Sequence, residues 1–154
     1  MIRRAEGRDA APLAALLRAL NTGDGRVPAR MTAQGVARDL IGDARVVVLL
    51  AAPDGLPAGF VTGHPFYDSK ASRWGCIMND LYVAPEARRQ GLGRGLVSAL
   101  ARAVAEDGGE FLRWHANEGD LTALAFHQGI GAQGGRTHDF LLDGAGFAAL
   151  TEAA

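Results

Sequence analysis

A short basic loop contains the residues of this sequence whose types and spacing best fit a chemical task. It covers residues 88–94, Arg-Arg-Gln-Gly-Leu-Gly-Arg, and it lies between an apolar stretch and a helical pattern. Gly91 and Gly93 lack side chains, so backbone N–H groups can face an anion, and the start of a helix adds a favourable dipole. The arginines supply positive charge. The sequence therefore predicts a phosphate-binding loop.

Two other glycine-rich phosphate loops have spacings that this segment does not match. A dinucleotide-binding turn has the pattern G-x-G-x-x-G, whereas the third glycine here, Gly95, comes one position early. A nucleotide triphosphate loop ends in a lysine followed by a hydroxyl residue, and neither occurs here. A glycine-rich turn with solvated arginines is the alternative for the motif taken alone.

The neighbouring elements would hold the loop between a strand and a helix. Apolar alternation over residues 74–83 predicts a strand, which Pro85 ends. Leucine and valine then recur at helical spacing over residues 91–107, and Gly108 follows as a helix stop. Strand, loop and helix are thus contiguous, which is the arrangement that anion binding at a helix N-terminus requires.

The rest of the pattern predicts one domain over residues 1–154. The expected strands are 1–5, 46–52, 58–67, 74–83, 111–116 and 137–142. The expected helices are one after Asp9, which would be its cap, and those at 32–41, 91–107 and 121–128, with a loop at 21–30. The strands on either side of the 91–107 helix should run parallel through a right-handed crossover.

The loop and its surroundings resemble the signature of the GNAT superfamily of N-acetyltransferases. That pattern, [RQ]-x-x-G-x-[GA] preceded by L-x-V-x-P-x-x-R, is matched over residues 81–93. Residues 120–132 follow the spacing of the family's second motif, with Asp120 and His127 where the family has asparagine and tyrosine. Within the superfamily, residues 59–83 look most similar to the diamine (spermidine/spermine-type) acetyltransferases.

This resemblance implies a GNAT-like α/β (α+β) fold, a mixed and mostly antiparallel sheet with a central parallel strand pair, flanked by helices. It also implies acetyl-CoA as co-substrate, with the pantetheine arm along residues 81–83 and the pyrophosphate on the loop. The cofactor-binding residues that it indicates are Leu81, Tyr82, Val83, Arg88, Arg89, Gln90, Gly91, Leu92, Gly93, Arg94, Asp120 and Phe126.

The catalytic residues that the resemblance implies depart from the family pattern. In the diamine branch a glutamate that assists amine deprotonation commonly precedes the position of Asp80, and here Asn79 stands there, which cannot be the base. Asp80 has two open roles, to bind the ammonium and relay its proton, or to bond backbone at a bulge. His127 would protonate the leaving thiolate, or else be a partly buried histidine bonded to a carbonyl. Asp120 would hold the cofactor arm or simply cap a helix.

The candidate acceptor-binding residues are Asn79, Tyr67 and Trp74. The two aromatic residues border the predicted hairpin loop 68–73, where they line a pocket or close a hairpin core. The expected acceptor is a primary amine of a small molecule, polyamine-like, an amino acid or an antibiotic. The alternatives are a protein N-terminus or lysine, and a CoA-binding sensor or partner module with reduced or lost catalysis.

Composition argues against several other partners. The net charge of −1 and the pI of about 6.4 predict no binding to nucleic acid or to an anionic membrane. The only cysteine, Cys76, fits a buried small hydrophobe in a reducing compartment, and the N-terminus lacks a signal core, so a cytoplasmic location is expected.

Two further expectations concern metals and assembly. The remaining histidines, His64, His115 and His138, are far apart in sequence and have no partner at helical spacing, so no metal site is expected. Residues 147–150 are apolar enough to need cover. Since members of the family often pair near the C-terminus, the resemblance implies a homodimer.

Overall fold

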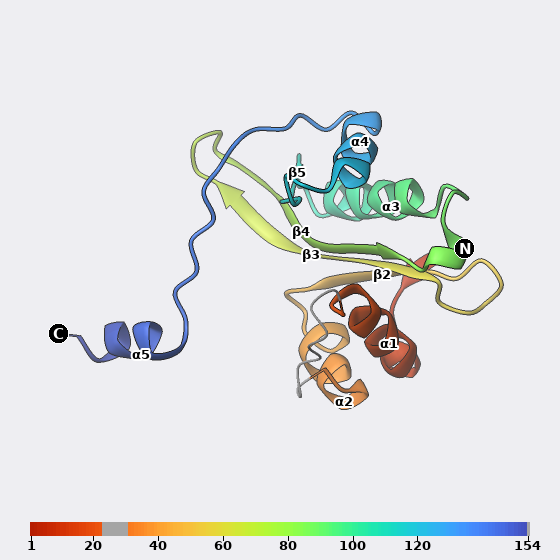
Figure 1. Cartoon of the computed structure of the whole chain (residues 1–154), viewed down its shortest axis with the longest axis horizontal. Coiled ribbons are helices and arrows are strands. Elements are labelled where there is room, and N and C mark those ends of the chain that lie inside the picture. The colour runs from red at the N-terminus through yellow and green to blue at the C-terminus, as the bar shows by residue number, and fades with distance from the viewer. Residues whose placement is uncertain (23–30, 154) are drawn as a thin grey trace. The chain divides into compact units, whose positions relative to one another are not determined.

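A five-stranded sheet in the order β1-β2-β3-β4-β5 organises the first part of the chain (Figure 1). The structure is a computed structural model that describes residues 1–22 and 31–153. The chain divides into two compact units, Met1–His115 and Ala116–Ala154, and each is described by itself. The single domain stays a prediction, and most of the predicted loop 21–30 lies outside the described residues.

The sheet is mixed, as predicted. Its strands are β1 (Ile2–Arg4), β2 (Val47–Ala51), β3 (Gly59–Asp68), β4 (Arg73–Val83) and β5 (Leu112–Arg113). Each of the first three pairings is antiparallel, and β4 and β5 are parallel. The helix between these two strands, α3 (Leu92–Glu106), makes the crossover that a parallel pair needs.

Helices cover both faces of the sheet (Figure 1). On one face, α1 (Ala10–Leu20) and α2 (Ala33–Val36) form an apolar cluster with Phe60 of β3. On the other, a Cβ built on Gly59 or Gly63 would lie 3.4 Å from a leucine of α3. Because side chains alternate along a strand, the even-numbered residues of β3 point to the first face and the odd-numbered ones to the second. We call these the α1 face and the α3 face.

The helix after Asp9 and the helix predicted over 32–41 are both present, but the first lacks its expected cap bond and the second changes its helical type. Asp9 precedes α1, but its carboxylate makes no cap bond. It accepts two hydrogen bonds from the Arg3 guanidinium, at 2.7 and 2.8 Å, and one from the Glu6 N–H, at 2.8 Å. The predicted helix 32–41 is present as α2 followed directly by the π-helical stretch η2 (Ala37–Ile41). Two 3₁₀ turns complete the first unit, η1 (Gly7–Asp9) and η3 (Pro85–Ala87).

The prediction of a last strand over 137–142 is wrong. These residues form no strand, and Phe140 and Leu141 are 90% and 82% exposed. A strand is stable only when another strand pairs with it, and no described residue pairs with this segment. The second unit contains two helices instead, α4 (Leu121–Gly129), as predicted, and α5 (Gly144–Glu152), which was not.

Candidate cofactor and acceptor site

An extra residue interrupts the pairing of β3 with β4. The cross-strand pairs on either side of the interruption are Thr62–Asp80 and Gly63–Met78. Asn79 is the residue left over, which makes this a β-bulge. A bulge bends its strand and increases the local twist. The β4–β5 ladder has two pairs and ends two residues before the bulge, so the two strands separate there.

The separation leaves one edge of β4 open. Just beyond the strand, the Ala84 N–H donates to the Ala58 carbonyl at 2.8 Å and therefore faces β3. Because alternate residues of a strand point their N–H and C=O groups in opposite directions, those of Leu81 and Val83 point away from β3. No strand in the described part of the chain pairs with this edge. An extended ligand can therefore bond to it as an added strand would.

The basic loop follows this edge directly and turns twice through left-handed backbone. Arg89 has φ of +63° and Gly91 has φ of +78°, the latter as the N-cap of α3. A left-handed conformation is costly for arginine and costs glycine nothing, so the turn needs glycine at position 91. The first N–H groups of α3, at residues 92–94, have no acceptor within the helix. Successive amides in such a turn form an anion-binding concavity.

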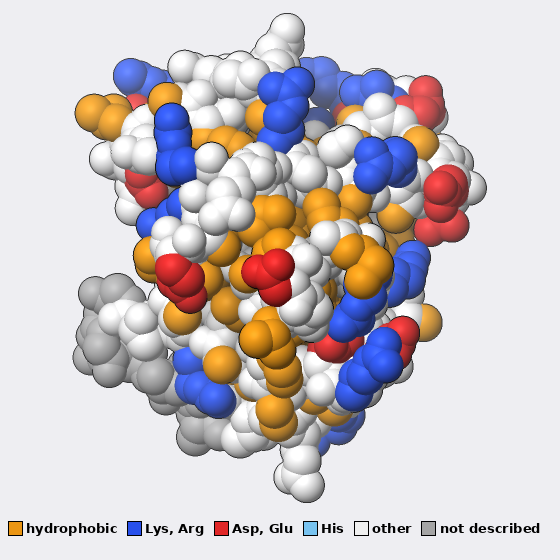
Figure 2. Space-filling model, turned by 90° about the vertical axis from the view of Figure 1, so that its right-hand side faces the viewer, with side chains coloured by type: hydrophobic (Ala, Val, Ile, Leu, Met, Phe, Trp, Pro, Cys, Tyr) orange, Lys and Arg blue, Asp and Glu red, His pale blue; other side chains and the backbone are white. Residues whose placement is uncertain are grey.

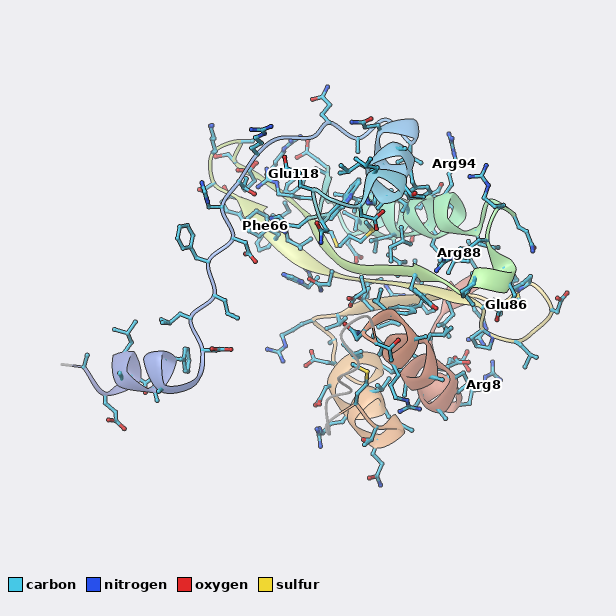
Figure 3. All side chains as sticks on the ribbon, viewed as in Figure 1. Arg8, Phe66, Glu86, Arg88, Arg94 and Glu118 are labelled. Atoms are coloured by element: carbon cyan, nitrogen blue, oxygen red, sulfur yellow. The ribbon has the colours of Figure 1, made fainter. Side chains whose placement is uncertain are left out.

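The arginines of the loop have different surroundings. The Arg88 Nε donates to the Val83 carbonyl at 2.9 Å, and its guanidinium lies 5.9 Å from the Tyr82 ring centre. Arg88 therefore ties the loop to the end of β4. Arg89 and Arg94 are exposed. Figure 3 shows Arg94 projecting from the start of α3, and Figure 2 shows an apolar surface with both basic and acidic side chains around it.

Polar side chains gather beside the bulge on the α1 face. The buried Thr62 hydroxyl donates to the Asp80 carboxylate at 2.8 Å. The Asn79 amide nitrogen lies 3.0 Å from the His64 Nδ1. Thr62 and His64 are alternate residues of β3, so both point to the same face as Phe60. The bulge thus places a carboxylate, an amide and an imidazole next to one another.

The structure does not bring the three predicted acceptor residues together. Tyr67 and Trp74 form a ring pair with centres 5.3 Å apart, and both are about half exposed. Tyr67 is an odd-numbered residue of β3 and so points to the α3 face, where Trp74 lines a hollow of about 260 Å³ with Val104 of α3. Asn79 bonds to His64 on the α1 face. The aromatic pair therefore lies on the other side of the sheet from Asn79.

Three predicted site residues belong to the second unit. The Asp120 carboxylate accepts from the Ala123 N–H at 3.0 Å and so caps α4. Phe126 and His127 are neighbours whose ring centres lie 5.4 Å apart. Burial lowers the pKa of His127 below its ordinary value, and the negative charge of Asp120 acts in the opposite direction. A shared site between these residues and β4 stays a prediction.

Comparison with known proteins identifies the family. The model of the acetyltransferase (GNAT) family matches residues 16–132. The chain belongs to the GNAT acetyltransferase family. Enzymes of this family use acetyl-CoA, and a related structure, the aminoglycoside N-acetyltransferase AAC(6')-Iy, is in complex with CoA.

Individual relatives are distant. L-ornithine N5-acetyltransferase of Arabidopsis thaliana is 30% identical over 80 residues, which are 52% of this chain and 35% of that protein. Thialysine N-epsilon-acetyltransferase of Bos taurus is 32% identical over 92 residues, 57% of this chain and 54% of that protein. The match thus spans about a third to a half of these relatives. AAC(6')-Iy with a bisubstrate analogue has a TM-score of 0.81 at 17% identity, covering 94% of this chain and 98% of that one, which shows the fold.

The GNAT family's cofactor fits the residues present here. The open edge at Leu81 and Val83 offers donors and acceptors to the amide groups of a pantetheine arm. The left-handed turn at Gly91 and the start of α3 offer N–H groups to a pyrophosphate. Tyr82 offers nothing to this edge, because its backbone groups face β3 and its ring centre lies 6.2 Å from that of Phe60 on the α1 face.

Sequence reasoning missed His64 and Thr62. Both are more than ten residues away from Asn79 and Asp80 in sequence, and they meet these residues only through the β3–β4 pairing. The alternation of β3 was visible in the sequence and could have put the two residues on one face. The position of the bulge, which sets their partners on β4, has no local signature. His64 was set aside because no second histidine lies at helical spacing from it.

The described residues provide no metal site, no reactive thiol and no membrane-spanning helix. Within residues 1–22 and 31–153, no group of three or more histidine, cysteine, aspartate or glutamate side chains could hold a metal ion. Burial raises the pKa of the Cys76 thiol, which keeps it protonated. Among the described helices, none combines the length and the apolarity needed to cross a bilayer.

Proposed function

We propose that this GNAT family member transfers the acetyl group of acetyl-CoA to a primary amine of a small molecule that is polyamine-like, an amino acid or an antibiotic. The observation that carries the proposal is the open edge of β4 at Leu81 and Val83, directly followed by the left-handed turn at Gly91. The names of the relatives support an amine acceptor, since one acts on L-ornithine and another on thialysine. The single buried cysteine supports a cytoplasmic location.

The cofactor would be held mostly by backbone. The amides of residues 89–94 and the side chains of Arg89 and Arg94 bind the pyrophosphate, while Leu81 and Val83 bond the pantetheine arm. An arm anchored at the loop runs along β4 from Val83 toward Leu81, so its far end reaches the bulge. Asp120 and Phe126 of α4 are proposed as further contacts. Bound there, acetyl-CoA supplies an activated acyl group as a thioester.

The residues beside the bulge would receive the amine. An amine is mostly a cation near neutral pH, and the Asp80 carboxylate attracts it. The hydrogen bond from Thr62 fixes the orientation of that carboxylate. Reaction needs the neutral amine, so a proton has to leave before the nitrogen can attack a carbonyl. We propose His127 as the group that returns a proton to the leaving thiolate.

Calorimetry with acetyl-CoA tests this function through the loop. Gly91→Glu places a negative charge among the amides that would hold the pyrophosphate, and we expect binding in the micromolar range to weaken by at least about 100-fold. A Cβ built on Gly91 meets no atom within 4 Å, so the substitution adds backbone strain but no clash. Equal affinity in wild type and Gly91→Glu, or no binding of either CoA or acetyl-CoA, contradicts the proposal.

Gly55→Glu is the matched control for that experiment. Gly55 lies in the turn between β2 and β3, with φ of +84° and no atom within 4 Å of a built Cβ. The Gly55→Glu substitution therefore adds a similar backbone strain and the same negative charge, but away from the loop. We expect Gly55→Glu to keep the affinity of the wild type. Binding of acetyl-CoA without release of thiol in the presence of any amine would instead indicate a cofactor-binding module.

A further inference from the structure

At the bulge in β4, the imidazole of His64 contacts the side-chain amide of Asn79, which cannot itself act as a base. The Asn79 amide and the His64 Nδ1 are 3.0 Å apart, and they come from neighbouring strands. His64 is half buried and Asn79 is exposed, so the pair borders the surface. Two residues earlier on β3, Thr62 holds Asp80 on the same face. The pair thus lies beside the carboxylate to which the amine is attracted.

We propose that His64 accepts the proton of the acceptor's ammonium group, and that Asn79 is the positioning residue that orients its ring. This assignment rests on the proposed function and adds to it the group that makes the amine nucleophilic. The N–H bond of the ammonium breaks and an N–H bond forms at His64 Nε2, directly or through one water. The products are a neutral amine and an imidazolium. The amine nitrogen then forms the new C–N bond as the C–S bond of the thioester breaks and its electron pair leaves with the CoA thiolate. The thiolate gains the proton that His127 is proposed to supply, the nitrogen gives up its second proton to water, and the His64 imidazolium releases its own to solvent.

The chemistry of the amide explains why asparagine suits this position. With its NH₂ group toward Nδ1, Asn79 donates to a neutral ring whose proton is on Nε2. A half-turn of the amide puts its oxygen toward Nδ1, which then donates, and Nε2 has a lone pair. The second arrangement also stabilises the ring after Nε2 gains a proton. Asn79 can therefore hold the ring before and after proton transfer.

Among the described residues, the charged side chains of the elements on the His64 side of the sheet have bonding partners of their own. Asp80 of β4 lies across from Thr62, two residues before His64 on the same face, and it accepts from the Thr62 hydroxyl. His64 is paired across the strands with Ile77, whose partner on β5 is Arg113. Arg113 lies 3.4 Å from the Asp68 carboxylate, so its charge is partly offset. The charged side chains of the flanking elements have partners of their own: Arg18 bonds the Met31 carbonyl, Arg38 bonds Asp39 and Arg45 bonds Asp43.

The first arm of the test measures the pair without any reaction. Nuclear magnetic resonance of protein labelled with ¹⁵N in its histidines reports the tautomer of each ring. Asn79→Leu has a similar volume and cannot bond to Nδ1, so we expect it to move the His64 ring resonances. Asn79→Asp keeps an oxygen acceptor and should preserve a single tautomer. The resonances of His115, an exposed histidine outside the pair, should not move. Unchanged His64 resonances in Asn79→Leu overturn the positioning role.

The second arm measures proton transfer with sisomicin, L-ornithine and thialysine as acceptor probes, using whichever gives the fastest thiol release. General-base catalysis contributes about 10²–10⁴-fold. We expect His64→Gln to lower kcat/KM about 100-fold near pH 7. The loss should shrink to a few-fold near pH 10, where a large part of an alkyl amine is already neutral in solution. Asn79→Leu should show the same pH dependence with a smaller loss, and His115→Gln should show none.

The results can contradict the role of His64 alone, or the proposed function together with it. A loss in His64→Gln that is equal at every pH indicates a structural role and overturns the assignment, as does a rate equal to wild type. Acetyl-CoA affinity, measured by calorimetry, should change by less than about 2-fold in the His64 and Asn79 variants. If the wild type binds acetyl-CoA and releases no thiol with any of the probes, the proposed class of acceptor is wrong, and the proposed role of His64 is wrong as well.

Discussion

His127 is the residue at which this chain departs most clearly from the pattern of its family, and its surroundings give the departure a measurable consequence. Burial lowers the pKa of its imidazole below the ordinary 6.5. If the protonated ring supplies the proton for the thiolate, turnover falls as pH rises through that lowered pKa. The alkaline limb of the rate profile should therefore lie below pH 6.5. Amine deprotonation acts in the opposite direction and gives the acidic limb.

Two substitutions test this expectation in steady-state rate profiles with the best acceptor probe. His127→Phe should remove the alkaline limb, because phenylalanine has no titrating proton. His127→Tyr should move the limb upward, since a phenol ordinarily titrates near 10. In both variants the acetyl-CoA affinity should stay within a few-fold of wild type. A His127→Phe enzyme with the wild-type rate and profile would mean that the histidine is structural.

Whether a site residue could be predicted from the sequence depended on how far its partners are along the chain. The turn at Gly91 is formed by its own backbone and by the helix that follows, so local spacing was enough to predict the turn and its place before α3. The sequence left Asp80 with two roles, and it does lie next to a bulge, with the Thr62 hydroxyl as its partner. Asn79 and His64 meet only because two strands pair in one particular register. No local pattern contains that information.

At the scale of elements, the ion pair between β1 and the start of α1 makes a prediction about acid stability. Asp9 is 4% exposed, and the Arg3 guanidinium beside it lowers the pKa of its carboxyl to about 2. A carboxyl with a lowered folded-state pKa stabilises the fold above its unfolded pKa, near 4, and loses that effect as pH falls toward 2. Asp9→Asn should therefore lower the free energy of unfolding by about 1–3 kcal/mol at pH 7. The difference from wild type should fade below about pH 4.

Urea unfolding at several pH values measures this effect, and Asp43→Asn provides a matched control. The pKa of the Asp43 carboxyl is also lowered to about 2, by its bonds to Arg45. That pair joins residues two apart, and the Arg45 side chain is 86% exposed. Exposed pairs of this kind contribute little to stability, because solvent screens their charges. Equal losses of stability in the two variants would contradict a special role for the link between β1 and α1.

Among helices and strands too, those defined by their own local pattern were predicted, and those that depend on a distant partner were not. Long segments with a clear period, such as α1, α3 and the β3–β4 hairpin, were predicted to within two residues, because their own side chains define a buried face. The segment 137–142 has the composition of a strand but lacks a partner among the described residues. A strand depends on a neighbour that its own sequence does not specify. The expected strand 111–116 is reduced to the two residues of β5 for a related reason, since β4 bends away after Ile77.

At the scale of the whole molecule, the C-terminal helix α5 carries an apolar surface. Phe147 and Leu150 are three residues apart, so they share one side of the helix, and they are 57% and 63% exposed. We propose that a second copy of the chain covers this side, which makes the protein a homodimer in solution. Light scattering over a range of concentrations should then show a dimer for the wild type and a monomer for Leu150→Asp. Leu121→Asp, at a 76% exposed site on α4, should remain dimeric. A wild type that is monomeric at every concentration contradicts the proposal.

The open edge at Leu81 and Val83 has a consequence for the protein's behaviour when its cofactor is scarce. Backbone groups that can bond an extended ligand can also bond a strand of another chain, which is how exposed sheet edges lead to aggregation. Natural edges are often shielded by charge, and here the guanidinium of Arg88 occupies the carbonyl of Val83. If acetyl-CoA binds along this edge as proposed, we expect its supply in the cell to influence the solubility of the protein as well as its rate, because the bound cofactor would cover backbone groups that can otherwise pair with another chain.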